Sequence, residues 1–292
     1  MPKAIQVAVS SVGYQDKQEF FILHMSENIE RLITIDDTQV DEIKKKEFFS
    51  RLGLSVRDAL KFHKQEGLWE NEGEKQTWKN VSEHCLVETA RATTLAELVQ
   101  LPQDIIESLK ISAALHDFNK KTEVEMLKKS GTWETYQNAN KSAEEKMKGN
   151  FSDRIIKYAG AVGHASFLET KKLLEKKEKK HEDIAYLIMH YVDDYTIGSN
   201  WVSPAEMAEN GKKINDLERR LSLGNAKPQY QELIESTKNE LGPAILDEYL
   251  KTGKEIEKNL TDLIREKTGA KIEAEELPEY IDQKIKDKIE KI

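Results

Sequence analysis

The sequence predicts an all-α protein, and three observations support this class. Apolar residues recur at three- and four-residue spacing along most of the 292 residues, as on the buried face of an amphipathic helix. Proline and glycine separate several of these segments, for example at Leu101-Pro102 and at Gly242-Pro243. Charged residues form 34% of the chain with both signs interspersed, which is typical of solvated helix faces. Only residues 5–9 suggest a short strand, and their alternation is poor.

The composition narrows the class of protein. No apolar run reaches the roughly 18 residues that a membrane-spanning helix needs. The first residues lack the sustained apolar stretch of a signal peptide, and Cys85 is the only cysteine, so no internal disulfide can form. We therefore expect a cytoplasmic protein without membrane contact. The formal net charge of −8 argues against wide contact with nucleic-acid backbone but leaves room for a local basic pocket that takes a small phosphorylated ligand.

Residues 1–75 are predicted to form a helical extension that leads into the core. Apolar residues at helical spacing indicate one helix over 18–35 and a second helical region after the stretch 36–38, which can cap it. Gly53 interrupts this second region, and the stretch 66–73 with its two glycines indicates a loop.

Residues 76–222 are predicted to form the central domain. Thr77 can act as the N-cap of the helix that carries His84, and Pro102 fits the first turn of the next helix. The polar stretch 138–150 is expected to be a surface insertion or a lid over the site. Further helices are predicted over 122–129, after Ser152-Asp153, and over 183–194.

Residues 223–292 are predicted to form a charged C-terminal extension with helices at about 228–240, 243–267 and 278–290. Charges such as Glu255 and Glu257 suggest that its helices are exposed. The extension also carries an apolar stripe, which must bury against the core or against a second subunit. A homo-oligomer formed through these helices is therefore one expectation. The stripe consists of Tyr230, Leu233, Leu241, Ile245, Leu246, Tyr249, Leu250, Ile256, Leu260 and Ile264.

The dipeptide His116-Asp117 is the centre of the candidate site. It ends a segment whose apolar stripe carries both side chains to the core-facing side of the helix end. Burying an imidazole and a carboxylate is costly unless something satisfies them. A divalent metal ion does so, because both groups are common metal ligands. The stripe consists of Ile105, Ile106, Leu109 and Ala113.

Two other predicted helices offer matching ligands. His84 shares a side with Val81 and Cys85, and we interpret Cys85 as a small core residue rather than a nucleophile. The helix over 183–194 ends in three further candidates, which are His190, Asp193 and Asp194.

The order His, His-Asp, Asp on successive helices resembles the HD superfamily of metal-dependent phosphohydrolases. The stretch Ala113-Ala-Leu-His-Asp-Phe-Asn-Lys120 is similar to the family signature, and the resemblance covers about residues 76–200. It implies an HD-type helical bundle with extensions at both ends. It also implies a metal site made by His84, His116, Asp117 and either Asp193 or Asp194, with Asp193 favoured by the family pattern.

Catalytic roles are expected for three residues that follow from this resemblance. Asp117 belongs to the metal site, and Lys120 would bind phosphate or orient the attacking water. His164, between Gly163 and Ala165 in a predicted loop before a helix, would line the substrate pocket or bind a second ion. His190 is either a ligand of that second ion or a buried, hydrogen-bonded histidine behind Asp193. We favour one ion over two, and the metal stays open among Mn, Fe, Mg, Co, Ni and Zn.

The expected function is hydrolysis of a phosphoester through a metal-activated water, with a nucleotide or another small phosphorylated compound as substrate. Two alternatives remain. Some relatives of the HD type use two irons for oxygen chemistry, so a diiron oxygenase is the first. A non-catalytic module that senses a ligand or acts as a scaffold is the second.

Overall fold

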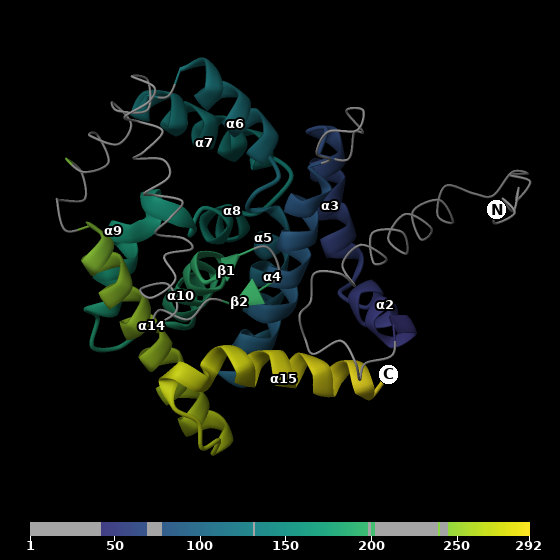
Figure 1. Cartoon of the computed structure of the whole chain (residues 1–292), viewed down its shortest axis with the longest axis vertical. Coiled ribbons are helices and arrows are strands. Elements are labelled where there is room, and N and C mark those ends of the chain that lie inside the picture. The colour runs from purple at the N-terminus through teal and green to yellow at the C-terminus, as the bar shows by residue number, and fades with distance from the viewer. Residues whose placement is uncertain (1–41, 69–77, 131, 198–199, 202–238, 240–244) are drawn as a thin grey trace, which may run out of the picture.

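The computed structural model describes residues 42–68, 78–130, 132–197, 200–201, 239 and 245–292. Over these residues the protein is all-α, as the sequence predicts (Figure 1). The exception is a short antiparallel pairing of β1 (Thr196–Ile197) with β2 (Asn200–Trp201), shortly after the helix His181–Asp194. The predicted strand at 5–9 and helix at 18–35 lie outside the described residues, as does nearly all of 228–240.

The described helices largely follow the predicted segments. Gly53 has a φ of 105°, which suits glycine, and it separates the helix that ends at Ser50 from the helix that begins at Leu54. Pro102 directly precedes the helix that begins at Gln103. The helices are α2 (Glu42–Ser50), α3 (Leu54–Gln65), α4 (Lys79–Leu98), α5 (Gln103–Leu115), α6 (Lys120–Lys129), α7 (Trp133–Met147), α8 (Asp153–Ala159), α9 (Gly163–Leu174), α10 (His181–Asp194), α14 (Ile245–Thr268) and α15 (Leu277–Glu290), with a 3₁₀ turn at Ala274–Glu276.

The polar stretch 138–150, which was expected to be a surface insertion or a lid, is mostly helical and exposed, because most of it belongs to helix α7. Thr132 caps this helix by accepting a hydrogen bond from the backbone N–H of Thr135 at 3.1 Å. Ala139, Ala143 and Met147 follow one another at four-residue spacing and are buried. Alanine favours helices, but two alanines and one methionine give only a weak apolar stripe. The sequence pattern therefore did not indicate a helix here.

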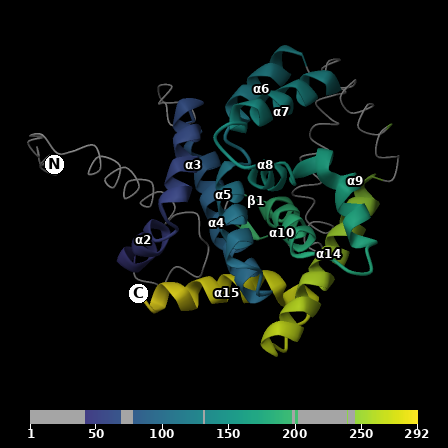
Figure 2. The same cartoon turned by 180° about the vertical axis from the view of Figure 1, so that it is seen from behind.

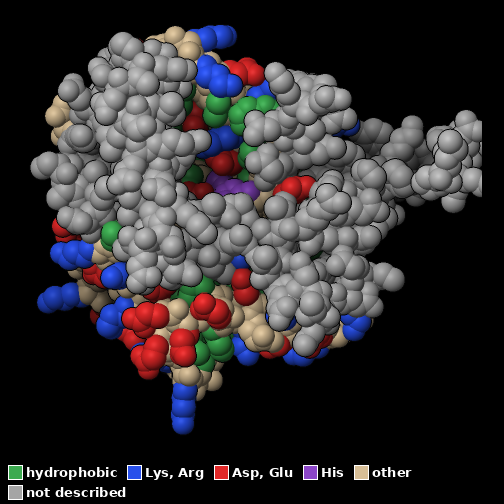
Figure 3. All heavy atoms as spheres, viewed as in Figure 1, with side chains coloured by type: hydrophobic (Ala, Val, Ile, Leu, Met, Phe, Trp, Pro, Cys, Tyr) green, Lys and Arg blue, Asp and Glu red, His purple; other side chains and the backbone are tan. Residues whose placement is uncertain are grey.

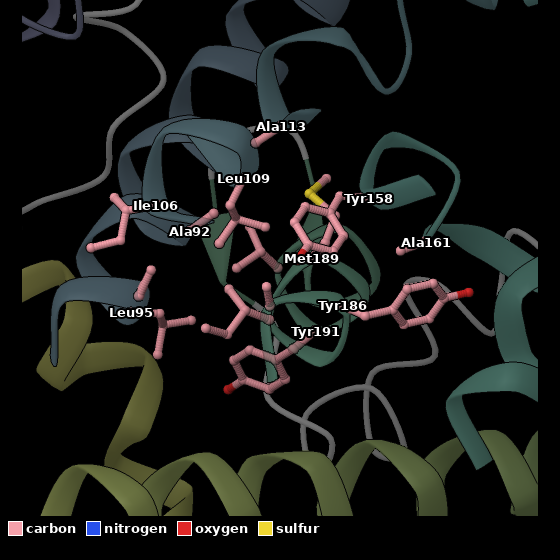
Figure 4. Close-up of a cluster of buried hydrophobic side chains, with 14 of the residues drawn as sticks. Ala92, Leu95, Ile106, Leu109, Ala113, Tyr158, Ala161, Tyr186, Met189 and Tyr191 are labelled. Atoms are coloured by element: carbon pink, nitrogen blue, oxygen red, sulfur yellow. The ribbon is translucent and has the colours of Figure 1, made fainter. Parts of the chain in front are cut away.

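Helix α10 lies at the centre of the bundle, with α4, α5, α8, α9 and α14 around it (Figures 1 and 2). Every side chain from Asp183 to Val192 is buried. Asp183 fixes the start of the helix, since its carboxylate accepts a hydrogen bond from the backbone N–H of Lys180 at 3.0 Å. Figure 4 shows how Met189 and Tyr191 meet apolar side chains from the surrounding helices. This packing holds the C-terminal end of α10, where Asp193 and Asp194 lie, in a fixed position.

The C-terminal helices pack on this same core rather than standing exposed. Ile256, Leu260 and Ile264 of α14 are buried, and α15 lies across α4 and beside α2 (Figures 1 and 2). Glu257 was expected on an exposed face but is only 3% exposed, so that expectation is wrong for this residue. Arg91 of α4, which is 2% exposed, pairs with Asp282 of α15 through two contacts of 3.0 and 2.9 Å.

The proposed division of the chain at 75/76 and 222/223 stays a prediction, because the residues at both boundaries lie outside the described part. In that part, α2, α3, α14 and α15 share one apolar core with the central helices. None of the described helices has both the length and the apolar character required to cross a membrane.

Candidate metal centre

Helix α4 places a histidine and a glutamate one turn apart on its buried face. His84 Nε2 lies 2.8 Å from Glu88 Oε1. Cys85 and Ala92 share that side of the helix and are fully buried, so the Glu88 side chain is carried into the interior, where it is also fully buried. A carboxylate in such a place needs a partner of opposite charge or several hydrogen bonds.

The end of helix α5 brings a second imidazole to Glu88. His116 follows the last residue of α5, and its Nδ1–H donates to the carbonyl oxygen of Ala113 at 2.8 Å. This bond leaves the lone pair on Nε2, which is the form of imidazole that binds a metal ion. His116 Nε2 lies 3.1 Å from Glu88 Oε2 and 4.0 Å from the sulfur of Cys85.

Asp193, near the end of helix α10, completes the cluster. Its Oδ1 lies 3.5 Å from His116 Nε2 and 3.9 Å from His84 Nε2. One ligand atom from each of His84, Glu88, His116 and Asp193 lies within 4.8 Å of all the others. Metal–ligand bonds of about 2.0–2.2 Å place ligand atoms roughly 3–4 Å apart, so these four atoms have suitable spacing for one ion.

The buried carboxylate of Glu88 indicates whether a metal ion fits these four residues. Both of its carboxylate oxygens are buried, and neither forms a hydrogen bond of acceptable geometry within the described part of the chain, although an imidazole nitrogen lies near each. Two carboxylates and two neutral imidazoles carry a charge of about −2, which one divalent ion neutralises. The four residues therefore fit a divalent metal ion.

The two histidines show that the cluster favours positive charge. Burial alone would lower the pKa of His84, but the carboxylates of Glu88 and Asp193 raise it well above its ordinary value. Burial likewise opposes the charged form of His116, and Cys85, Glu88 and Asp193 together raise its pKa well above the ordinary value. A metal ion must therefore displace protons from both rings, so its affinity is expected to fall as the pH decreases.

A pocket of about 740 Å³ opens beside the cluster. His116, Asp117 and Asp193 line it, together with residues of α6, α7 and α8. Figure 3 shows histidine side chains at the bottom of a hollow that is bordered by acidic and basic groups. The size suits a small organic ligand, since ligand pockets typically measure about 300–1,000 Å³.

Asp117 lies in this pocket but is not one of the four closest ligand residues. Its Oδ1 is 3.5 Å from Lys120 Nζ, which also lies 3.4 Å from Glu123 Oε1. Burial raises the pKa of the Asp117 carboxyl, but the charges of Lys120 and His116 outweigh that effect and hold the pKa below its ordinary value. Asp117 is therefore an ionised carboxylate between the cluster and the pocket.

His190 and Asp194 form a separate pair behind the cluster. His190 Nε2 lies 2.9 Å from Asp194 Oδ2, and its Nδ1 lies 3.1 Å from the carbonyl oxygen of Ala161 and 2.9 Å from Ser166 Oγ. Both ring nitrogens are engaged, so the structure places His190 as a buried, hydrogen-bonded histidine. Of the two aspartates at the end of α10, Asp193 lies in the cluster and Asp194 does not.

His164 is the second residue of helix α9, not part of a loop before the helix. Its side chain lies outside what the structure describes, so its expected roles stay predictions. Val162, two residues earlier, lines the pocket.

The sequence reasoning missed Glu88, although a signal was present. Glu88 follows His84 by four residues and therefore lies on the same helix face as His84 and Cys85. A carboxylate on that otherwise apolar side resembles the pattern that identified His116-Asp117. His63 is buried, and its ring nitrogens lie 2.8 Å from Ser82 Oγ and 2.7 Å from the carbonyl oxygen of Ala114.

Comparisons with known proteins assign no family to the chain. No protein-family model, curated protein sequence or solved structure matches it. The assignment of a candidate metal site therefore rests on the cluster itself. Its four residues could hold one metal ion within an all-helical protein.

Proposed function

We propose that the protein is a metal-dependent phosphohydrolase of the HD type that acts on a small phosphorylated compound, with nucleotides as the first class to test. The observation that carries this proposal is the buried carboxylate of Glu88 between two imidazoles, beside a pocket that contains ionised Asp117 and Lys120. His84, Glu88, His116 and Asp193 would hold the ion, and Asp117 is available as a further ligand on the pocket side.

The chemistry divides between the ion and the pocket residues. When bound, a divalent ion supplies a hydroxide-like nucleophile near neutral pH and neutralises charge on a phosphoryl oxygen. Asp117 is ionised and can accept the proton of the attacking water. Lys120 lies beside it and can bind another phosphoryl oxygen. Cys85 is fully buried, which supports a mechanism without this residue as a covalent nucleophile.

The pairing of His190 supports one ion rather than two. A diiron oxygenase of the HD type would need His164 and His190 as ligands of a second metal. His190 already contacts Asp194 through Nε2 and Ala161 and Ser166 through Nδ1. We therefore favour mononuclear hydrolysis over the diiron alternative.

Reconstitution of the metal-free protein tests this proposal. Protein stripped with a chelator is loaded separately with Mn, Fe, Mg, Co, Ni or Zn, and phosphate release is measured from a nucleotide panel and from p-nitrophenyl phosphate. We expect hydrolysis with at least one metal, and its loss in His116→Ala and Asp193→Ala. His181→Ala, which changes an exposed histidine at the start of α10, is the control and should retain activity.

Three results would contradict or redirect the proposal. Full activity in both ligand variants would contradict the site. Oxygen consumption with two bound irons would favour the oxygenase. Metal binding without turnover on any substrate would favour a ligand-sensing module.

A further inference from the structure

The pocket beside the metal cluster is larger than a single phosphate group requires, and its lining includes basic side chains. Lys141 and Lys148 reach it from the side of α7, and Lys157 reaches it from α8. Such an arrangement can select a substrate by a part of the molecule that does not react.

Two of the basic side chains that line the pocket, Lys120 and Lys148, lie beside carboxylates of the same pocket. Lys120 lies near Asp117 and Glu123. Lys148 Nζ lies 2.8 Å from Glu144, and this hydrogen bond, with smaller effects of Glu145 and Asp153, raises the pKa of Lys148. Three acidic side chains of the pocket, those of Asp117, Glu123 and Glu144, therefore lie beside these two lysines.

Lys141 and Lys157 differ from them, because neither forms an ion pair with any residue that the structure describes. Both are exposed and line the pocket from different helices. The Lys157 ammonium lies 5.7 Å from the centre of the Tyr186 ring, and its charge also helps to lower the pKa of Asp183. Two ammonium groups that are not held in ion pairs with described residues thus remain at the pocket walls.

The Lys157 ammonium lies near Tyr186, which belongs to the same helix as Asp193 of the metal cluster. Tyr186 precedes Asp193 by seven residues on α10, which corresponds to roughly 10 Å along the helix axis. Lys157 lines the same pocket as Asp193 but is not one of the four residues of the metal cluster.

We infer that the substrate carries a second anionic group, remote from the scissile phosphate, which Lys141 and Lys157 bind. The substrate class is a small phosphoester with anionic groups at both ends, of which a bisphosphate is the simplest example. This inference rests on the proposed function for the identity of the reacting end, while the second anion site can be tested on its own by binding.

A matched pair of synthetic substrates tests the inference. Hexane-1,6-diol bisphosphate has a linker that can span the two ends, and hexyl phosphate lacks the second anion. We expect a higher kcat/KM for the bisphosphate, mainly through a lower KM, and an advantage that shrinks as ionic strength increases. Lys157→Ala and Lys141→Ala should each reduce the ratio of the two kcat/KM values by about three- to tenfold, a range for a charge-assisted contact.

Two further variants separate a specific contact from a general change of charge. Lys157→Arg keeps the charge and should restore most of the ratio. Lys128→Ala removes an exposed lysine of α6 that does not line the pocket, and should leave both substrates unaffected. An equal change for both substrates in Lys157→Ala, or no preference for the bisphosphate in the wild-type protein, would overturn the inference.

Calorimetric binding distinguishes this inference from the proposed function. If no metal supports hydrolysis, titration with the bisphosphate still measures the second anion site. Binding that exceeds that of hexyl phosphate and weakens in Lys157→Ala would support the site even though the hydrolase proposal had failed. Equal binding of the two compounds would reject the site whether or not hydrolysis is observed.

Discussion

Replacing Glu257 with glutamine is expected to stabilise the protein, by an amount that grows as the pH rises. Glu257 of α14 is 3% exposed and accepts a hydrogen bond from the hydroxyl of Tyr191 on α10 at 2.9 Å. Burial raises its pKa from 4.5 to about 7, with smaller contributions from Glu275 and Glu279. The carboxyl is therefore protonated in the folded protein at a pH where it is ionised in the unfolded chain.

The sign and size of the effect follow from this difference in pKa. Between pH 4.5 and 7 the folded state binds more protons than the unfolded state, so stability falls as the pH rises through this window and is flat above it. The shift of about 2.5 units corresponds to at most about 3 kcal/mol. Glutamine remains neutral and keeps an oxygen that can accept from Tyr191, so the variant lacks this loss.

Chemical denaturation of the chelator-treated protein at several pH values measures the effect. The difference in free energy of unfolding between Glu257→Gln and the wild-type protein should increase by about 2–3 kcal/mol from pH 5 to pH 8. Glu255→Gln changes an exposed residue of the same helix and should show no such increase. A difference that does not change with pH would refute the reasoning.

Three further outcomes are expected. Asp282→Ala should lower the free energy of unfolding by about 3 kcal/mol in denaturant melts, because it removes the carboxylate that pairs with the buried guanidinium of Arg91. Replacing both residues by leucine should recover much of this loss. Burial and the nearby His116 lower the pKa of His63 to about 4, so the free energy of unfolding of the wild-type protein should fall by up to about 3 kcal/mol as the pH drops from 6.5 to 4. His63→Asn should show a smaller fall. An equal fall in the two proteins would contradict this. His190→Gln should still bind one metal ion per chain by elemental analysis, and a drop from two ions to one would establish a second site.

Much of the fold could be predicted because its helices carry clear apolar stripes. The stripe that ends at His116 and the apolar stretch 184–192 of α10 each bury as expected. Helix α7 was missed because its buried side consists mostly of alanine. The placement of the C-terminal stripe against the core could not be derived, because a stripe shows that a helix must bury one face but not which surface covers it.

The site could be predicted only to the extent that helical spacing shows which side chains lie on a buried helix face. His84 and His116 were identified from their positions at the buried faces or ends of helices, and Asp193 was preferred through the family resemblance; the three meet in the structure. Asp193 and Asp194 are adjacent residues, so helical spacing alone does not decide which one faces α4. That choice depends on how α10 packs, including the pairing of Asp194 with His190. Glu88 was open to prediction from its position one turn after His84.

The central claim is that a buried cluster containing Glu88 holds one divalent metal ion. Metal titration of the chelator-treated protein, compared between the wild type and Glu88→Gln, tests it most directly. The substitution keeps the shape of the side chain but removes the charge and one ligand oxygen, and Glu97→Gln is the control because Glu97 is exposed on the same helix. We predict one ion per chain in the wild type and the control, and at least about tenfold weaker binding in Glu88→Gln. Binding that Glu88→Gln leaves unchanged, or no binding of any divalent metal to the wild-type protein, would contradict the claim.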